Sequence, residues 1–121
     1  MSVFGQVIQV AFPKRLPRGH EQEGLRPALV VSDPTNQQKL ESPMLIVAPI
    51  TTQDKKEGVL RVKLEVGDGG LSMVSTIMIE QLTTVDISRV RGAYGRLTGA
   101  KLEQARTALR AALSDFLEIG A

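Results

Sequence analysis

Residues 60–66 read Leu-Arg-Val-Lys-Leu-Glu-Val, in which apolar and charged side chains alternate strictly. Successive side chains of a β-strand point to opposite faces of a sheet, so this pattern predicts a strand with one apolar face and one solvated face. The next four residues, Gly67-Asp68-Gly69-Gly70, favour turns and end the strand. This stretch therefore predicts a sheet that has one face in the core.

Further strands are predicted on both sides of this stretch, because short apolar runs bounded by turn residues indicate buried strands. Such runs occupy residues 7–12, 28–32, 45–50 and 75–81. Residues 86–90 predict a short helical turn, which precedes a last short strand at 93–96. A polar segment at 14–24 separates the first two strands, and its length indicates a functional loop, since long structureless connections are uncommon in compact domains.

The C-terminal segment predicts an amphipathic helix, because its apolar residues recur three and four positions apart. This stripe consists of Leu102, Ala105, Leu109, Ala112, Leu113, Phe116 and Leu117, and we expect it to pack against the core. Thr98 is the predicted N-cap, and Leu97 and Leu102 flank it as a hydrophobic staple. Gly120 is the residue on which the helix is expected to end. The predicted fold class is mainly β with a C-terminal helix (α+β), arranged as a small, partly open barrel.

The composition predicts one cytoplasmic domain over residues 1–121. A chain of 121 residues is long enough to bury a core without covalent staples. It contains no cysteine, which excludes disulfides and thiolate metal sites, and its single histidine argues against a structural zinc site. The N-terminus lacks the features of a signal peptide, and no run reaches the about 18 apolar residues of a membrane span.

The formal net charge of +2 is compatible with a polyanionic partner. Two basic groups stand out, Lys14, Arg15 and Arg18 early in the chain and Arg89, Arg91 and Arg96 late in it. Each group alone is also explained as solvated loop charge. Aromatic residues make up only 3% of the chain, too few for a platform on which bases stack. Any bound nucleic acid is therefore held by charges, amides and hydroxyls.

Common catalytic signatures are absent from the sequence. It has no Ser-His-Asp order, no paired-histidine metal motif and no glycine-rich phosphate loop of the nucleotide-binding kind. Polar groups gather instead at strand boundaries, in residues 18–27, 49–53 and 80–86.

These three segments resemble the MazF/PemK (Kid-like) toxin endoribonucleases, in the order in which that family carries its motifs. Gly19-His20-Glu21-Gln22, followed by Gly24-Leu25-Arg26-Pro27, resembles the opening motif, a polar loop that leads into an arginine-proline strand. Ile46-Val47-Ala48-Pro49-Ile50-Thr51-Thr52 resembles the second motif, an apolar strand that ends in threonine. Glu80-Gln81-Leu82-Thr83-Thr84-Val85-Asp86 resembles the third.

The resemblance implies an SH3-like, CcdB/MazF-type barrel that forms a homodimer and binds a MazE-like antitoxin. It also implies sequence-selective cleavage of single-stranded RNA (mRNA) without a metal or another cofactor. In this chemistry the 2′-hydroxyl of the RNA attacks the adjacent phosphate, which leaves a cyclic phosphate and a 5′-hydroxyl end.

Arg26 and Thr51 match the catalytic pair of the family. The arginine supplies a permanent cation with a donor fork that suits phosphate oxygens, and the threonine supplies a hydroxyl for the same group. His20 is a third catalytic candidate, because histidine is the side chain whose ordinary pKa lies near neutrality. The candidates for RNA binding or site support are Glu21, Gln22, Thr52, Gln53, Glu80 and Gln81.

Two other interpretations of the same resemblance stay open. One is a non-catalytic toxin of the same fold that grips gyrase, as CcdB-like proteins do, since fold alone does not decide function. The other is a degenerate member that only binds RNA or an antitoxin. Gln6 and Thr83 support the second, because they stand where relatives commonly carry an acidic residue and an arginine. Met78 stands where the Kid-like branch of the family carries an arginine, which sets the chain apart from the catalytic residues of that branch.

Overall fold

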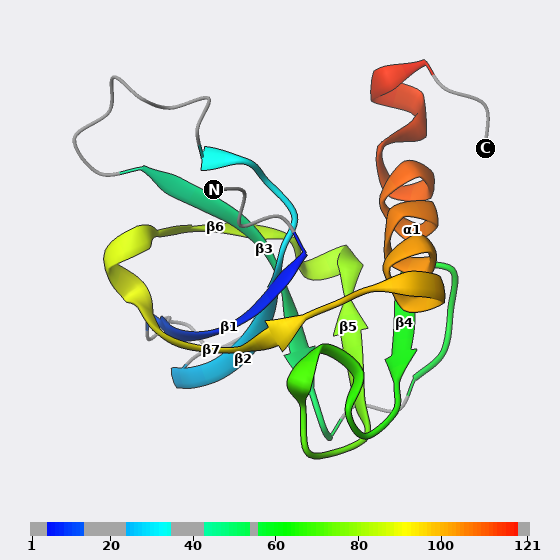
Figure 1. Ribbon diagram of the computed structural model, residues 1–121. Helices are drawn as coiled ribbons and strands as arrows, with labels where there is room; N and C mark the ends of the chain where they lie inside the picture. The colour runs from blue at the N-terminus through cyan, green and yellow to red at the C-terminus, as the bar shows by residue number, and fades with distance from the viewer. Residues whose placement is uncertain (1–4, 14–23, 35–42, 54–55, 119–121) are drawn as a thin grey trace.

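The computed structural model describes residues 5–13, 24–34, 43–53 and 56–118, which form an antiparallel sheet with one helix at its side (Figure 1). The strands are β1 (Gln6–Phe12), β2 (Gly24–Val30), β3 (Met44–Thr51), β4 (Arg61–Leu64), β5 (Ser75–Met78), β6 (Thr83–Asp86) and β7 (Val90–Arg96). The helix α1 covers Gly99–Leu117, and 3-10 turns form η2 (Asp68–Gly70), η3 (Ile79–Gln81) and η4 (Ile87–Arg89). The predicted class, mainly β with a C-terminal helix, is confirmed.

The strand β3 organises the sheet. The strands lie in the order β4-β5-β3-β2-β1-β7, with β6 also beside β3, and all of these pairings are antiparallel. One edge of β3 pairs with β2, while the other edge pairs first with β6 and then, at its last two residues, with β5. The sheet is open, because β4 and β7 stand at the two ends of this order.

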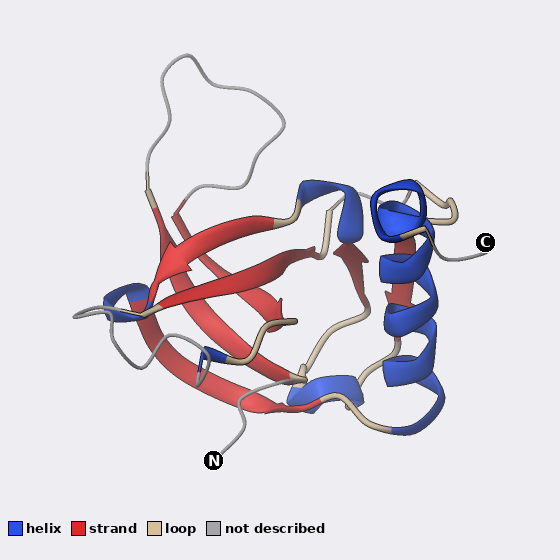
Figure 2. Cartoon of the chain, turned by 90° about the horizontal axis from the view of Figure 1, so that it is seen from above, coloured by secondary structure: helices blue, strands red, loops and turns tan. Residues whose placement is uncertain are grey.

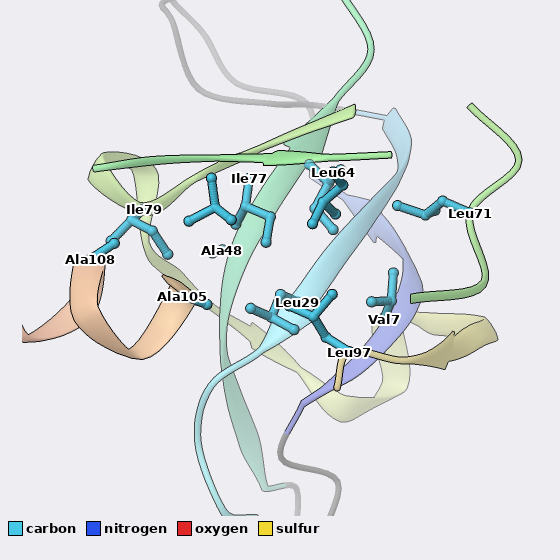
Figure 3. Close-up of a cluster of buried hydrophobic side chains, with 12 residues drawn as sticks. Val7, Leu29, Ala48, Leu64, Leu71, Ile77, Ile79, Leu97, Ala105 and Ala108 are labelled. Carbon is cyan, nitrogen blue, oxygen red and sulfur yellow. The ribbon is translucent and has the colours of Figure 1, made fainter. Parts of the chain in front are cut away.

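Alternate residues of β1, β2 and β3 enter two separate hydrophobic clusters, one on each face of the sheet. The first consists of Val7, Leu29, Ala48, Ile50, Val62, Leu64, Leu71, Ile77, Ile79, Leu97, Ala105 and Ala108. The second consists of Ile8, Val10, Phe12, Ala28, Val30, Leu45, Val47 and Val85. Figure 3 shows the first cluster, with the two alanines of α1 at one end and Val7, Leu71 and Leu97 at the other. Burial on both faces explains why these strands read as continuous apolar runs.

Several strand boundaries differ from the prediction. The strand β4 covers only Arg61–Leu64, so that Val66 of the alternating stretch is 65% exposed, and β7 begins at Val90 rather than Ala93. The segment 75–81 is not one strand, because β5 ends at Met78 and η3 follows. The strand β2 begins at Gly24 rather than Ala28 and continues through Pro27. Proline is tolerated there because pairing to β3 is recorded only from Ala28 onward, so one edge of Pro27 lies outside that ladder.

The strand β6 is absent from the prediction, and its polar composition is the reason. Thr83, Thr84 and Asp86 do not resemble a buried run, and only Val85 of this strand is buried. Pairing with Met44–Val47 of β3 holds the segment in place.

The helix α1 begins after Thr98, as predicted, but not through the predicted cap bond. Thr98 has the extended backbone of an N-cap residue, yet its side chain makes no capping hydrogen bond. The staple residues Leu97 and Leu102 both belong to or pack on the first cluster. The helix ends at Leu117, and Glu118 adopts the left-handed conformation (φ 57°), whereas the predicted terminator Gly120 lies outside the described residues.

Only the first half of the apolar stripe on α1 packs on the core. Ala105 and Ala108 are buried, but Leu113, Phe116 and Leu117 are 42%, 89% and 52% exposed. The prediction of a wholly packed stripe is therefore wrong for the last two turns. In Figures 1 and 2 the helix stands beside β4, and in Figure 1 its last turns extend past the end of that strand, where no strand covers them.

The glycine turn after β4 packs tightly on β7. A Cβ added to Gly70 would lie 2.1 Å from the carbonyl oxygen of Tyr94, and one added to Gly95 would lie 2.9 Å from the carbonyl oxygen of Gly69. Gly70 also has a φ of +80°, a conformation that favours glycine. The backbones of η2 and β7 can therefore approach this closely only because Gly70 and Gly95 have no side chain.

Candidate active site

Arg26 and Thr51 lie on neighbouring strands, each two residues beyond the end of the recorded β2–β3 ladder. The recorded pairs between β2 and β3 are Ala28 with Pro49, Leu29 with Ala48 and Val30 with Val47. The same register, continued by two residues beyond the end of this ladder, sets Arg26 opposite Thr51. Directly opposed residues of antiparallel strands have their side chains on the same face, with Cβ atoms about 5 Å apart.

Neither residue is covered by the core. Arg26 is exposed on β2, and its partner on the other side, Val10 of β1, belongs to the second cluster. Thr51 is half-buried at the end of β3. The structure therefore leaves the guanidinium of Arg26 and the hydroxyl of Thr51 accessible to a ligand.

The hydroxyl of Thr51 is oriented by its own backbone. Its Oγ1 accepts a hydrogen bond from the amide of Gln53 at 3.2 Å, a local turn of the kind that threonine forms at strand ends. Because the oxygen accepts this bond, the hydroxyl hydrogen remains available for donation to another acceptor. Thr52 and Gln53 themselves are exposed beside it.

Glu80 is engaged with a residue that the sequence analysis did not single out. Its carboxylate accepts a hydrogen bond from Nε of Arg61 at 2.8 Å and a second one from Nη2 of the same guanidinium. This two-pronged ion pair links η3 to β4. The two side chains retain 14% and 32% of their exposure, for Arg61 and Glu80 respectively. This pairing favours site support over direct contact as the role of Glu80.

We expect Glu80→Gln to lower the free energy of unfolding by about 1 kcal/mol, because the change removes the charge from a partly buried pair. Urea denaturation measures this difference. The matched control is Glu103→Gln, which breaks the exposed pair of Glu103 with Arg106 on α1 (2.5 Å) and should change stability by less than about 0.5 kcal/mol. Equal effects of the two substitutions would contradict the structural role of the Arg61–Glu80 pair.

Gln81, the next residue, has an unusual environment. Its side-chain oxygen is buried and has no hydrogen-bond partner within the described part of the chain. Buried polar atoms are nearly always satisfied, so this oxygen is available to a donor that the described residues do not supply.

A pocket of about 790 Å³ opens next to Thr51. It is lined by Thr51, Thr52, Lys56, Glu57, Gly58, Arg61, Lys63, Met73, Val74, Ser75, Thr76 and Gln104. The pocket thus joins the end of β3 to β4, β5 and α1. Arg26, Gln53, Glu80 and Gln81 do not line it.

The predicted site residues fall into three groups. His20, Glu21 and Gln22 lie outside the described residues. The second group is Arg26 with Thr51, which the continued β2–β3 register relates, together with Thr52 and Gln53, which follow Thr51 in the chain. The third group is Glu80 and Gln81, which lie on η3. The sequence analysis missed Arg61, Lys63 and Thr76; the signal for the first two was their place on the charged face of the alternating stretch 60–66.

Two features are absent from residues 5–13, 24–34, 43–53 and 56–118. No helix there is long and apolar enough to cross a membrane. No group of three or more histidine, aspartate or glutamate side chains there is arranged to hold a metal ion.

Comparison with known proteins agrees with the motifs and the fold. The family model described as PemK-like, MazF-like toxin of type II toxin-antitoxin system matches residues 4–113. The protein named endoribonuclease MazF from Staphylococcus saprophyticus is 30% identical over 93 residues, which is 76% of each chain.

Solved structures give the same result. The crystal structure of MazF from Deinococcus radiodurans superposes with a TM-score of 0.71 at 25% identity and covers 92% of this chain and 94% of that one. A mycobacterial endoribonuclease in complex with its cognate antitoxin shares the fold, with a TM-score of 0.64 at 19% identity over 92% and 93% of the two chains. Since the family model matches almost the whole sequence, the chain belongs to the PemK-like, MazF-like toxin family of type II toxin-antitoxin systems.

Proposed function

We propose that this protein is a toxin that cleaves single-stranded RNA, mRNA in particular, at selected sequences and without a metal ion. The coarser part, an endoribonuclease of the MazF type, follows from family membership and from the relative of that name. The finer part is supported by the motifs that resemble the family and, for the catalytic pair, by the β2–β3 register, which brings Arg26 opposite Thr51 when it is continued two residues past the recorded pairs.

The proposed reaction is a transesterification. The 2′-hydroxyl of the RNA attacks the adjacent phosphorus and loses its proton, and the bond from phosphorus to the 5′-oxygen breaks. The products are a cyclic phosphate and a 5′-hydroxyl end. Catalysis requires a base for the 2′-hydroxyl, an acid for the leaving oxygen and stabilisation of the charge that gathers on the phosphate.

Arg26 and Thr51 supply the third requirement. The guanidinium fork of Arg26 binds the non-bridging phosphate oxygens, and the hydroxyl of Thr51 donates to the same group. The bond from the amide of Gln53 supports this role, because it leaves the hydrogen of the Thr51 hydroxyl for the phosphate. Histidine suits proton transfer near neutral pH, so we assign His20 to the acid or base role.

Base selection is assigned to other polar side chains of the three motifs. Glu21, Gln22, Thr52, Gln53 and Gln81 offer amide, carboxylate and hydroxyl edges that suit contacts to unpaired bases. Gln81 is assigned from its place in the third motif. Glu80 contributes by holding Arg61.

The proposed partners are a second copy of the chain and a MazE-like antitoxin, in the cytoplasm. Solved relatives include a mycobacterial toxin in complex with its cognate antitoxin and MazE–MazF from Deinococcus radiodurans. Family membership in a toxin-antitoxin system supports the antitoxin as a partner of this chain as well.

The decisive experiment digests a mixture of long single-stranded RNAs with the purified full-length protein in excess EDTA and sequences the fragment ends. We expect cleavage at one short recurring sequence, with 2′,3′-cyclic phosphate and 5′-hydroxyl ends. Intact RNA at high protein concentration would contradict the proposal, and 5′-phosphate ends would contradict the mechanism. Expression that arrests growth with DNA breaks and intact RNA would support a gyrase-binding toxin instead.

A further inference from the structure

A row of polar residues runs from Thr51 across the neighbouring strands β5 and β4. Thr51 pairs with Thr76 of β5, and Thr76 pairs with Lys63 of β4. Opposed residues share a face, so the side chains of Thr51, Thr76 and Lys63 stand in one row across three strands. Extension of the β2–β3 register adds Arg26 at the other end of this row.

This row leads from the proposed catalytic pair into the pocket. Thr51, Thr76 and Lys63 all line it, together with Lys56 and Glu57. Lys63 is exposed, and its ammonium forms no ion pair with any residue that the structure describes. Its backbone carbonyl accepts a hydrogen bond from the ammonium of Lys101 at 2.6 Å, which ties this position to α1.

The pocket also has apolar lining residues. Met73 and Val74 line it and remain 58% and 46% exposed. The pocket can therefore bind two kinds of group. The hydroxyls and the lysine suit an anion, and the exposed apolar side chains suit a flat, weakly polar group. A nucleotide carries both.

We infer that the pocket is a binding subsite for the nucleotide next to the cleaved bond, in which Lys63 and Thr76 hold the neighbouring phosphate and Met73 and Val74 contact the base. The inference rests on the proposed RNA-cleaving function. Strands lie about 4.8 Å apart, so the backbone of Thr76 is one strand and that of Lys63 two strands, about 10 Å, from Thr51. Lys63 therefore starts farther from the proposed catalytic pair than any other residue of the row, and we assign it to a phosphate other than the one that the pair holds.

The test uses the full-length protein and an RNA oligonucleotide that contains the cleavage sequence. We expect Lys63→Ala to raise KM about 5-fold with kcat unchanged, and to reduce the slope of log affinity against log salt by about 0.7, the value for one phosphate contact to a single strand. Thr76→Val, which keeps the β-branched shape but removes the hydroxyl, should raise KM in the same way by a smaller factor.

A substrate change identifies the phosphate. Two oligonucleotides each carry one uncharged methylphosphonate, on one or the other side of the cleaved linkage. With one of these substrates, wild type and Lys63→Ala should have the same KM, because the phosphate that Lys63 holds is already uncharged. With the other substrate, the 5-fold difference in KM should persist. A difference that persists with both substrates would overturn the inference.

The matched control is Arg91→Ala, which removes one positive charge on β7, at the opposite end of the strand order from β4. If Lys63→Ala and Arg91→Ala changed the KM for the unmodified substrate by the same factor, the proposed subsite would also be contradicted. Failure of the wild-type protein to cut RNA would overturn the proposed function itself. The two failures are therefore distinguishable in one set of assays.

Discussion

Thr51→Val should reduce the rate of RNA cleavage by about 100- to 1000-fold, the cost of losing one donor to the charge of a transition state. The substitution keeps the shape of the side chain, so the end of β3 and its pairing with β5 should remain. Single-turnover cleavage of the oligonucleotide measures the rate. Arg26→Lys should show a similar loss although it keeps the charge, because lysine lacks the two-pronged fork of arginine.

Two variants make this prediction specific. Thr51→Ser keeps the hydroxyl and should retain most of the activity, and Thr84→Val, at an exposed threonine of β6, should retain all of it. The double variant of Arg26 and Thr51 should be little slower than either single variant, since groups that act on one phosphate are not additive. Full activity of Thr51→Val would show that the reaction occurs elsewhere on the protein.

Gly70→Ala should lower the free energy of unfolding by about 3 kcal/mol. About 1 kcal/mol comes from the left-handed backbone conformation and the rest from displacement of the β7 backbone by the new methyl group. The contact responsible is the 2.1 Å approach of that methyl position to the carbonyl oxygen of Tyr94. Urea denaturation followed by circular dichroism measures the change.

Gly67→Ala separates the two causes. Gly67 has a φ of +96° but no atom within 4 Å of an added Cβ, so this substitution introduces the backbone strain without the collision. It should cost about 1 kcal/mol. If both variants lost the same stability, close packing of the turn on β7 would not contribute to the fold.

The parts of the fold that could be predicted are those in which one residue period dominates. The alternation at 60–66 indicated β4, and the period of α1 indicated its start, because these patterns reflect burial of one face. The segment of β6 could not be predicted, since pairing with β3 rather than its own composition makes it a strand. The last turns of α1 are exposed because the sheet does not extend far enough to cover them. The period of apolar residues in the helix gives no information about the extent of the sheet.

The candidate site divides in the same way. Arg26 and Thr51 came from motifs that resemble a known family, and only the register of β2 and β3 relates them in space. The partner of Glu80 could not be predicted, because Arg61 lies 19 residues away on another element. Thr76 and Lys63 are ordinary strand residues in the sequence, and their relation to Thr51 appears only when three strands are aligned.

The place of the proposed pair near the ends of two strands has a mechanical consequence. The recorded pair of Thr51 is with Thr76 of β5 and that of Arg26 is with Val10 of β1, whereas Val47 in the middle of β3 is paired on both edges. Segments with fewer shared hydrogen bonds open at lower free energy, so amide hydrogen exchange should be faster at Arg26 and Thr51 than at Val47. Both groups of the proposed pair can therefore shift when the substrate enters and again when the product departs.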